Sequence, residues 1–236
     1  MHLFNAIFIP NSMILQDSYM ITKVDVIIPT KSNFTGLVNL LDSIKNDPAL
    51  GQIVIIADGE NAYNTLLAIS QTYKFDLLSV PLGIGIHKMW NMGMDKVQPN
   101  NQHIAIINDD VVLSPNTLSI SCDILNNNSD IGLLCPWSDL SFQEYFMPTS
   151  SFAGFCMIMP ADLVSKWRFD ERMKWWYGDD DVKSWVSRVA NKKIGITGKC
   201  HAIGNMSHTI NGDPPPNFHA AVINDEKLYR EKWGNR

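Results

Sequence analysis

The sequence lacks several features that would place it in a familiar class of protein. It has four cysteines, none in a C-x-x-C pair, and each stands in an apolar or strand-like stretch. This pattern indicates buried, reduced thiols and a cytoplasmic protein. The sequence also lacks a basic excess, because its formal net charge is −5, and this argues against a nucleic-acid partner held by bulk charge.

No apolar run is long enough to span a membrane. Residues 1–16, MHLFNAIFIPNSMILQ, are fairly apolar, but Pro10 and Asn11 interrupt them and no basic segment opens them. The stretch therefore does not fit a transmembrane helix. We expect residues 1–22 to be an extension without a catalytic role, and a peripheral contact with the cytoplasmic face of a membrane stays open. Residues 23–236 suffice for a single domain with a sizeable core.

The most informative stretch that is present is QHIAIINDDVVL at 102–113. Its apolar part predicts a buried strand, and Asn108, Asp109 and Asp110 follow at the carboxyl end, where open α/β sheets bind ligands. Two adjacent acids between apolar runs are costly to bury unless a positive group meets them, and a divalent cation carrying a phosphate-bearing substrate would do so. Taken alone, the stretch is better explained as a strand-to-turn junction with a solvated pair of acids.

The first part of the chain alternates strands with helices. VDVIIPT at 24–30 and QIVIIAD at 52–58 predict strands, and Asn33 is a plausible cap for the helix between them. Strand, helix and strand with short joints indicate a parallel crossover unit. Gly83 and Gly85 permit close approach of a ligand, although the third glycine of a dinucleotide fingerprint is missing.

A second acidic site lies in FDERMKWWYGDDDVKSWVSRVA. Three aromatic residues precede three acids: Trp175, Trp176, Tyr177, Asp179, Asp180 and Asp181. Acids in the first turn of a helix are favoured by the helix dipole by ~0.3–1 kcal/mol each, so a capped helix is one sufficient explanation. Aromatic rings beside carboxylates also suit a bound sugar, while core packing explains at least one of the rings.

In this order, the segments resemble the family 2 glycosyltransferases with the GT-A fold. The matching segments are VDVIIPT, IVIIADG, GIGIHKMWNMG, INDDVVL and FDERMKWWYGDDDV, followed by KWG. The resemblance implies an α/β fold with a Rossmann-like, mixed and mainly parallel sheet flanked by helices. It also implies one GT-A domain over 23–236, with a nucleotide-binding half at about 23–113 and an acceptor-binding half at about 114–236.

The resemblance further implies a donor site for a UDP-, GDP- or dTDP-linked sugar and a Mn²⁺ or Mg²⁺ ion. Asp58 would accept a hydrogen bond from the base, and Asp110 would bind the metal. His201 is the first choice for a second metal ligand and His208 the second choice, although a lone histidine is more often a packed or surface side chain. The residues expected at the donor are Pro29, Thr30, Asp58, Gly85, Lys88, Asn91, Asn108 and Asp109.

The catalytic assignment implied by the resemblance is an inverting sugar transfer with an Asp general base. The family motif E-D-x-D stands here as D-D-D, so the base is either Asp179 or Asp180. The wall for the hydroxyl acceptor, a glycan or another alcohol, would be formed by Trp175, Trp176 and Tyr177.

Two other functions are weighed against this one. A sugar-nucleotide nucleotidyltransferase wants an arginine in the loop after the first strand, and the loop PTKSNFTG has none. A non-catalytic GT-A-like protein that binds a glycan or a partner is supported by Asn108, which stands where the family has the first Asp of D-x-D, and by the shortened acidic motif.

Overall fold

The computed structural model describes residues 22–97, 103–137, 146–149, 154–204, 214 and 217–234. Its strands are β1 (Val24–Thr30), β2 (Leu50–Asp58), β3 (Asp76–Val80), β4 (His103–Ile107), β5 (Val111–Leu113), β6 (Ile131–Trp137), β7 (Phe146–Thr149), β8 (Cys156–Pro160) and β9 (Lys193–Gly204). Its helices are α1 (Phe34–Ile44), α2 (Glu60–Ile69), α3 (Ile86–Lys96), α4 (Thr117–Asn127), α5 (Ala161–Val164), α6 (Gly178–Arg188) and α8 (Phe218–Trp233). Among these described helices, none combines the length and apolar character needed to cross a bilayer.

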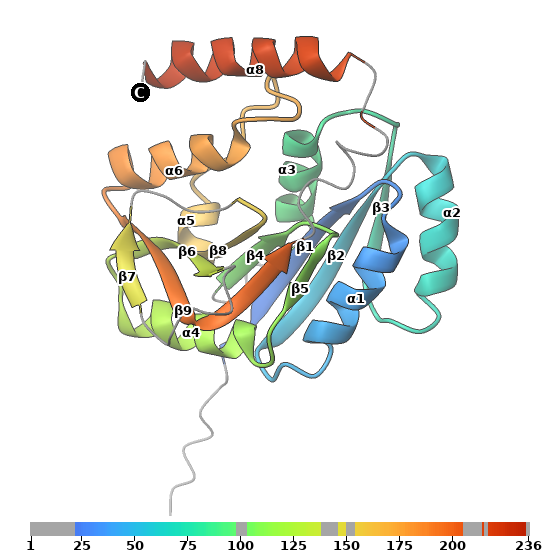
Figure 1. The fold of residues 1–236 in the computed structure, drawn as a ribbon, viewed down its shortest axis with the longest axis horizontal. Helices are drawn as coiled ribbons and strands as arrows, with labels where there is room; N and C mark the ends of the chain where they lie inside the picture. Colours follow the sequence, from blue (N-terminus) through green and yellow to red (C-terminus); the bar gives the residue numbers. More distant parts are fainter. Residues whose placement is uncertain are drawn as a thin grey trace, which may run out of the picture.

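The strands form one mixed sheet in the order β3-β2-β1-β4-β8-β6-β9-β5, and β7 pairs with β9 (Figure 1). The first four of these run parallel, β8 is antiparallel to both β4 and β6, and β6 and β9 are again parallel. The predicted crossover unit is confirmed, because β1 and β2 pair in parallel around α1. The predicted sheet flanked by helices is confirmed as well.

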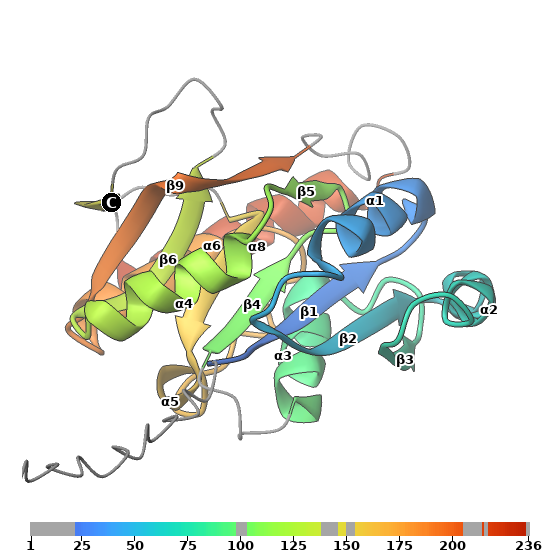
Figure 2. The ribbon, with the colours of Figure 1, turned by 90° about the horizontal axis from the view of Figure 1, so that it is seen from below.

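Hydrophobic residues on both faces of the sheet hold the layers together. Alternate residues of β1 point to opposite faces, so Ile28 packs in the cluster that contains Leu40 of α1, while Ile27 packs in the cluster that contains Met94 of α3. Figure 2 shows α1 and α4 on one face and α3 and α5 on the other. Gly93 allows α3 to approach closely, since a Cβ there would lie 2.3 Å from Ile27 Cγ2.

Two strand predictions need correction. The sequence predicts a short strand at 194–196, whereas β9 runs for 12 residues, because β6 and β7 pair with its first part and β5 with its last. β7 falls in a stretch that the sequence analysis leaves without a strand. It contains Pro148 and pairs only with β9, and a sheet edge is where a strand tolerates proline.

Candidate active site

A cleft of about 380 Å³ lies where the carboxyl ends of β1, β2 and β4 face the start of α6. Five carboxylates border it: Asp58, Asp109, Asp110, Asp179 and Asp180. Lys31 is the one lysine or arginine among the described residues that line it. The two acidic sites of the sequence therefore meet in one cleft, which is the arrangement that the predicted chemistry requires.

The turn after β4 is fastened to the loop after β1. Thr30 Oγ1 donates a hydrogen bond of 2.5 Å to Asp109 Oδ2, and Asn33 Nδ2 donates one of 3.3 Å to the backbone oxygen of Asp109. Burial raises the pKa of Asp109 to about 7, and the neighbouring charge of Asp110 adds to the shift. The predicted cap is present too, since Asn33 Oδ1 accepts from Gly36 N at 3.2 Å.

Asp58 ends β2 and reaches across to the next loop. Its Oδ1 accepts a hydrogen bond of 2.7 Å from Gly83 N, and burial raises the pKa of its carboxyl group. Gly85 has a φ of 102°, and a Cβ there would lie 3.1 Å from the backbone of Lys174. The glycines therefore let this loop fold back on Asp58 and pass under the segment that carries the tryptophans.

The first turn of α6 presents two of its three acids to the cleft. Asp179 Oδ1 accepts a hydrogen bond of 3.0 Å from Asp180 N, and Asp180 pairs with Lys183 Nζ at 2.8 Å. Burial, together with the charge of Asp180, raises the pKa of Asp179. Gly154 provides the space for it, because a Cβ at Gly154 would lie 2.4 Å from Asp179 Cβ.

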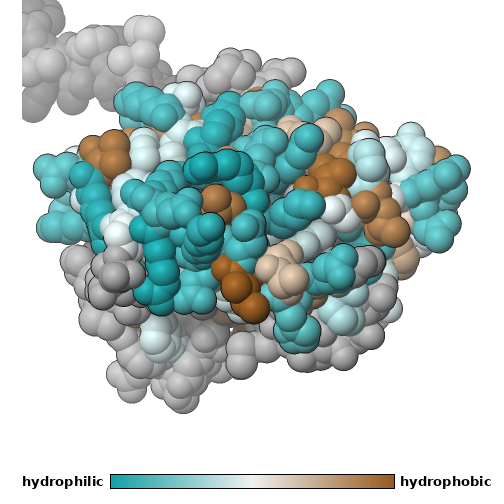
Figure 3. Space-filling view, turned by 90° about the horizontal axis from the view of Figure 1, so that it is seen from above, coloured by the Kyte–Doolittle hydropathy of each residue, from teal (hydrophilic) through white to brown (hydrophobic). Residues whose placement is uncertain are grey.

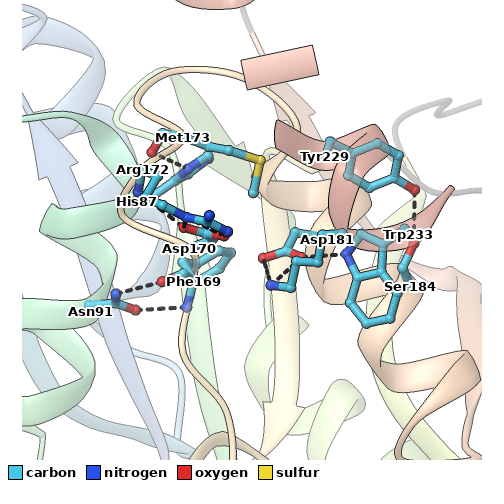
Figure 4. Close-up of polar contacts among 11 residues, drawn as sticks. His87, Asn91, Phe169, Asp170, Arg172, Met173, Asp181, Ser184, Tyr229 and Trp233 are labelled. Carbon is cyan, nitrogen blue, oxygen red and sulfur yellow. Dashed lines mark hydrogen bonds and ion pairs between the residues drawn. The ribbon is translucent and has the colours of Figure 1, made fainter. Parts of the chain in front are cut away.

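Asp181 does not line the cleft. It is fully buried and accepts a hydrogen bond of 2.7 Å from Trp233 Nε1, and Lys232 Nζ lies 2.8 Å from its Oδ1 (Figure 4). The third acid of the D-D-D run thus fastens α6 to α8. Asp179 and Asp180 are left to face the ligand space.

The predicted acceptor residues, Trp175, Trp176 and Tyr177, line the same cleft as Asp58 and Asp110, and Phe218 of α8 joins them. Trp176 is 42 % exposed and meets the Phe218 ring edge-on at 6.1 Å between centroids. Tyr177 stacks on Tyr229 at 5.2 Å. Trp175 and Trp176 therefore border the open space, whereas one face of Tyr177 is used in packing.

Asn91 and Lys88 lie elsewhere than the donor prediction places them. Asn91 is buried, and its amide exchanges two hydrogen bonds of 2.9 Å with the backbone of Phe169 (Figure 4). Asn91 Nδ2 donates a third, of 3.0 Å, to Glu171 Oε1. Lys88 lies on the exposed side of α3, and neither residue lines the cleft. Asn91 therefore anchors Phe169 and Glu171 of the FDER segment to α3 and does not line the cleft.

His201 lies apart from Asp110. The antiparallel register pairs Val111 with Gly204, and His201 N donates to Ser114 Oγ at 2.9 Å. Gly204 lies three positions after His201 along β9, which is about 10 Å. His208 lies outside the described residues, and within those residues no group of three histidines, cysteines or acids could hold a metal ion.

Sequence reasoning did not find several residues of the cleft. Ile86, Met89, Trp90 and Phe155 give it an apolar lining, and Lys31 adds a positive charge. Lys31 directly follows the strand-ending Pro-Thr, so its position was a usable signal. Phe218 had no signal, because its place in the cleft depends on where α8 docks.

A larger hollow of about 830 Å³ opens at the other end of β4, between α4 and α5. Its charged residues include Arg168, which is bound to Asp95 at 2.7 Å. None of the residues that the sequence analysis selects for chemistry lines this hollow.

Comparison with known proteins finds no matching family model and no curated protein of similar sequence. Solved structures do match. S. aureus TarS is 12% identical over 77% of this chain and 60% of its own, with a TM-score of 0.60. A second TarS structure is 14% identical over 89% of this chain and 39% of its own, with a TM-score of 0.63. GalNAc-T7, solved with UDP, GalNAc and Mn²⁺, is 11% identical over 79% of this chain and 44% of its own, with a TM-score of 0.67.

These matches define the fold class. The chain has the GT-A fold that these glycosyltransferases share, as the sequence predicts. It spans between 39% and 60% of the length of the solved proteins it matches.

Proposed function

We propose that the protein is an inverting glycosyltransferase, which moves a sugar from a nucleotide donor to a hydroxyl group. The observation that carries this proposal is that one cleft is lined by Asp58 and Asp110, at strand ends, by Asp179 and Asp180, and by the aromatic residues 175–177. The GT-A fold supports the proposal, and the site supplies the chemistry, since fold alone does not determine function.

On the donor side, Asp58 would accept a hydrogen bond from the base, with Pro29 and Thr30 beside it. Among the described residues that line the cleft, five carboxylates and one lysine repel a diphosphate, so we expect the donor to bind together with a cation. Asp110, with Asn108 and Asp109 beside it, would hold Mn²⁺ or Mg²⁺, since such ions use one or two carboxylates and take further ligands from phosphate. When bound, the ion stabilises negative charge on the leaving diphosphate.

On the acceptor side, a carboxylate takes the proton of the attacking hydroxyl. Asp179 is our first choice because burial raises its pKa, which makes its carboxylate the stronger base. Asp180 forms an ion pair with the ammonium group of Lys183, and this pair must break before Asp180 can bind the acceptor hydroxyl. Attack from this side, opposite the diphosphate, inverts the anomeric carbon. Neither Lys88 nor Asn91 contacts the donor in this proposal.

The test is sugar transfer by Asp179→Asn and Asp180→Asn, assayed with UDP-, GDP- and dTDP-sugars and manganese. The variant that lacks the base should lose turnover by about 100-fold or more while nucleotide binding, followed by thermal shift, is retained. Asp123→Asn, an exposed acid on α4, is the matched control. A wild-type chain that binds nucleotide but transfers from no donor contradicts the proposal and favours a glycan- or partner-binding protein.

A further inference from the structure

The fully buried residues of helix α8 carry polar groups, and they lie among apolar residues that are half-buried. Only Asp225 and Tyr229 of its residues are buried, and both carry polar atoms. Figure 1 shows α8 lying across the top of the molecule above α6, and its outward face in Figure 3 is mainly hydrophilic. A surface helix usually buries apolar residues most deeply, so the full burial of Asp225 in α8 needs a specific explanation.

The buried carboxylate of Asp225 is bound by three successive backbone amides. Its Oδ1 accepts from Lys174 N at 3.0 Å, and its Oδ2 accepts from Trp175 N at 2.8 Å and from Trp176 N at 3.0 Å. Burying a charge is costly unless hydrogen bonds satisfy it, and successive N–H groups form a natural anion-binding concavity. Asp225 thus fixes the backbone of both cleft tryptophans.

The same segment is held from its other side by α3. Ile86 N donates to Lys174 O at 2.7 Å, and the ring nitrogen Nδ1 of His87 lies 2.7 Å from Met173 O. The backbone of residues 173–176 is therefore bound between α3 and α8. The side chains of Trp175 and Trp176 remain at the cleft.

Further contacts fix α8 against the acidic helix. Tyr229 Oη lies 2.8 Å from Ser184 Oγ (Figure 4). The Tyr229 ring also stacks on Tyr177. Trp233 and Lys232 bind Asp181, as described above. One helix thereby sets the positions of the aromatic wall and of the acids that follow it by two to three residues.

We propose that Asp225 is a positioning residue for the acceptor: it holds Trp175 and Trp176 in place for stacking against an acceptor sugar, and α8 adds Phe218 to that surface. The acceptor class follows from the lining, because flat rings beside carboxylates fit a ring that has both apolar C–H faces and hydroxyl groups. This inference rests on the proposed function. It assigns acceptor affinity, and not donor affinity, to Asp225.

The experiment compares Asp225→Asn with Glu226→Gln, which removes a neighbouring acid of α8 that pairs only with Arg230 in the described contacts. An Asn side chain turns an NH₂ group toward at least one amide that now donates to carboxylate. We expect hydrogen exchange at residues 174–176 to accelerate at least tenfold in Asp225→Asn. The acceptor KM should rise at least tenfold, with donor KM and nucleotide binding within twofold of wild type.

Each outcome decides the inference. Unchanged exchange at 174–176 in Asp225→Asn overturns the clamp, and a fall in kcat at constant acceptor KM shows a loss of folded enzyme instead of positioning. Glu226→Gln should match the wild type in every measurement. If the wild-type protein transfers no sugar, both the proposed function and the acceptor role of Asp225 are wrong. The hydrogen-exchange measurement in that case still shows whether Asp225 holds residues 174–176.

Discussion

The two sides of the cleft are built by different means. On the donor side, Asp58 and Asp110 follow strands whose side chains fill two hydrophobic clusters, so the core itself positions the acids. On the acceptor side, polar contacts do this work, and they join residues about 50 positions apart, such as Asp225 with Lys174. The comparison teaches that one side inherits its geometry from the sheet, while the other depends on a few specific hydrogen bonds.

The largest effect should come from Asp110→Asn on the donor side. We expect transfer to fall by about 100-fold or more, since charge stabilisation at the leaving group usually contributes that much. The manganese-dependent thermal shift with nucleotide should disappear, whereas the stability of the free protein should stay close to that of Asp123→Asn. If Asp110→Asn transfers sugar as fast as wild type and EDTA has no effect on the rate, the assignment of a metal ion to the donor side is wrong.

Asn91→Ala should have the next largest effect. It tests the hydrogen bonds between α3 and residues 169–171, which lie away from both ligands. Three hydrogen bonds are lost and the buried backbone of Phe169 is left unpaired, so the free energy of unfolding should fall by about 2–3 kcal/mol. Lys88→Ala, an exposed position on the same helix, should stay within about 0.5 kcal/mol of wild type. Urea denaturation measures both, and equal values for the two variants would contradict the anchoring role of Asn91.

The smallest effect concerns the pH dependence of stability through Asp109, measured without metal. Its folded pKa of about 7 lies above the ordinary value, so the folded state gains a proton before the unfolded state as pH falls. The contribution of Asp109 to wild-type stability should therefore become more favourable as pH falls from about 7 toward 4. Asp109→Asn removes this term, so the difference in stability between this variant and wild type should change in favour of the variant from pH 4 to pH 8. A gap that is constant with pH would show that Asp109 does not titrate there.

Much of the donor side could be predicted from the sequence. Apolar runs that end in polar residues mark strand ends, and this pattern placed Thr30, Asp58 and Asp110 at one edge of the sheet. The cap at Asn33 was predictable for the same reason, because a cap acts on its own helix.

The remaining features depend on which way a side chain points after packing. Asn91 and Lys88 are three residues apart on one helix, yet only packing against the 167–172 segment makes one an anchor and leaves the other exposed. His201 could not be placed without the length and register of β9. Asp225 resembles any acid of an amphipathic helix until the loop that it binds is known.

The polar docking of α8 has a consequence for how the molecule opens. Denaturant sensitivity and the heat-capacity change both scale with the surface that becomes exposed, and apolar surface dominates the heat-capacity term. Release of α8, which buries only Asp225 and Tyr229 fully and its other apolar residues in part, would therefore contribute less to both quantities than loss of the hydrophobic clusters. The aromatic residues of the acceptor wall could lose their positions while a global melting curve still reported a folded protein.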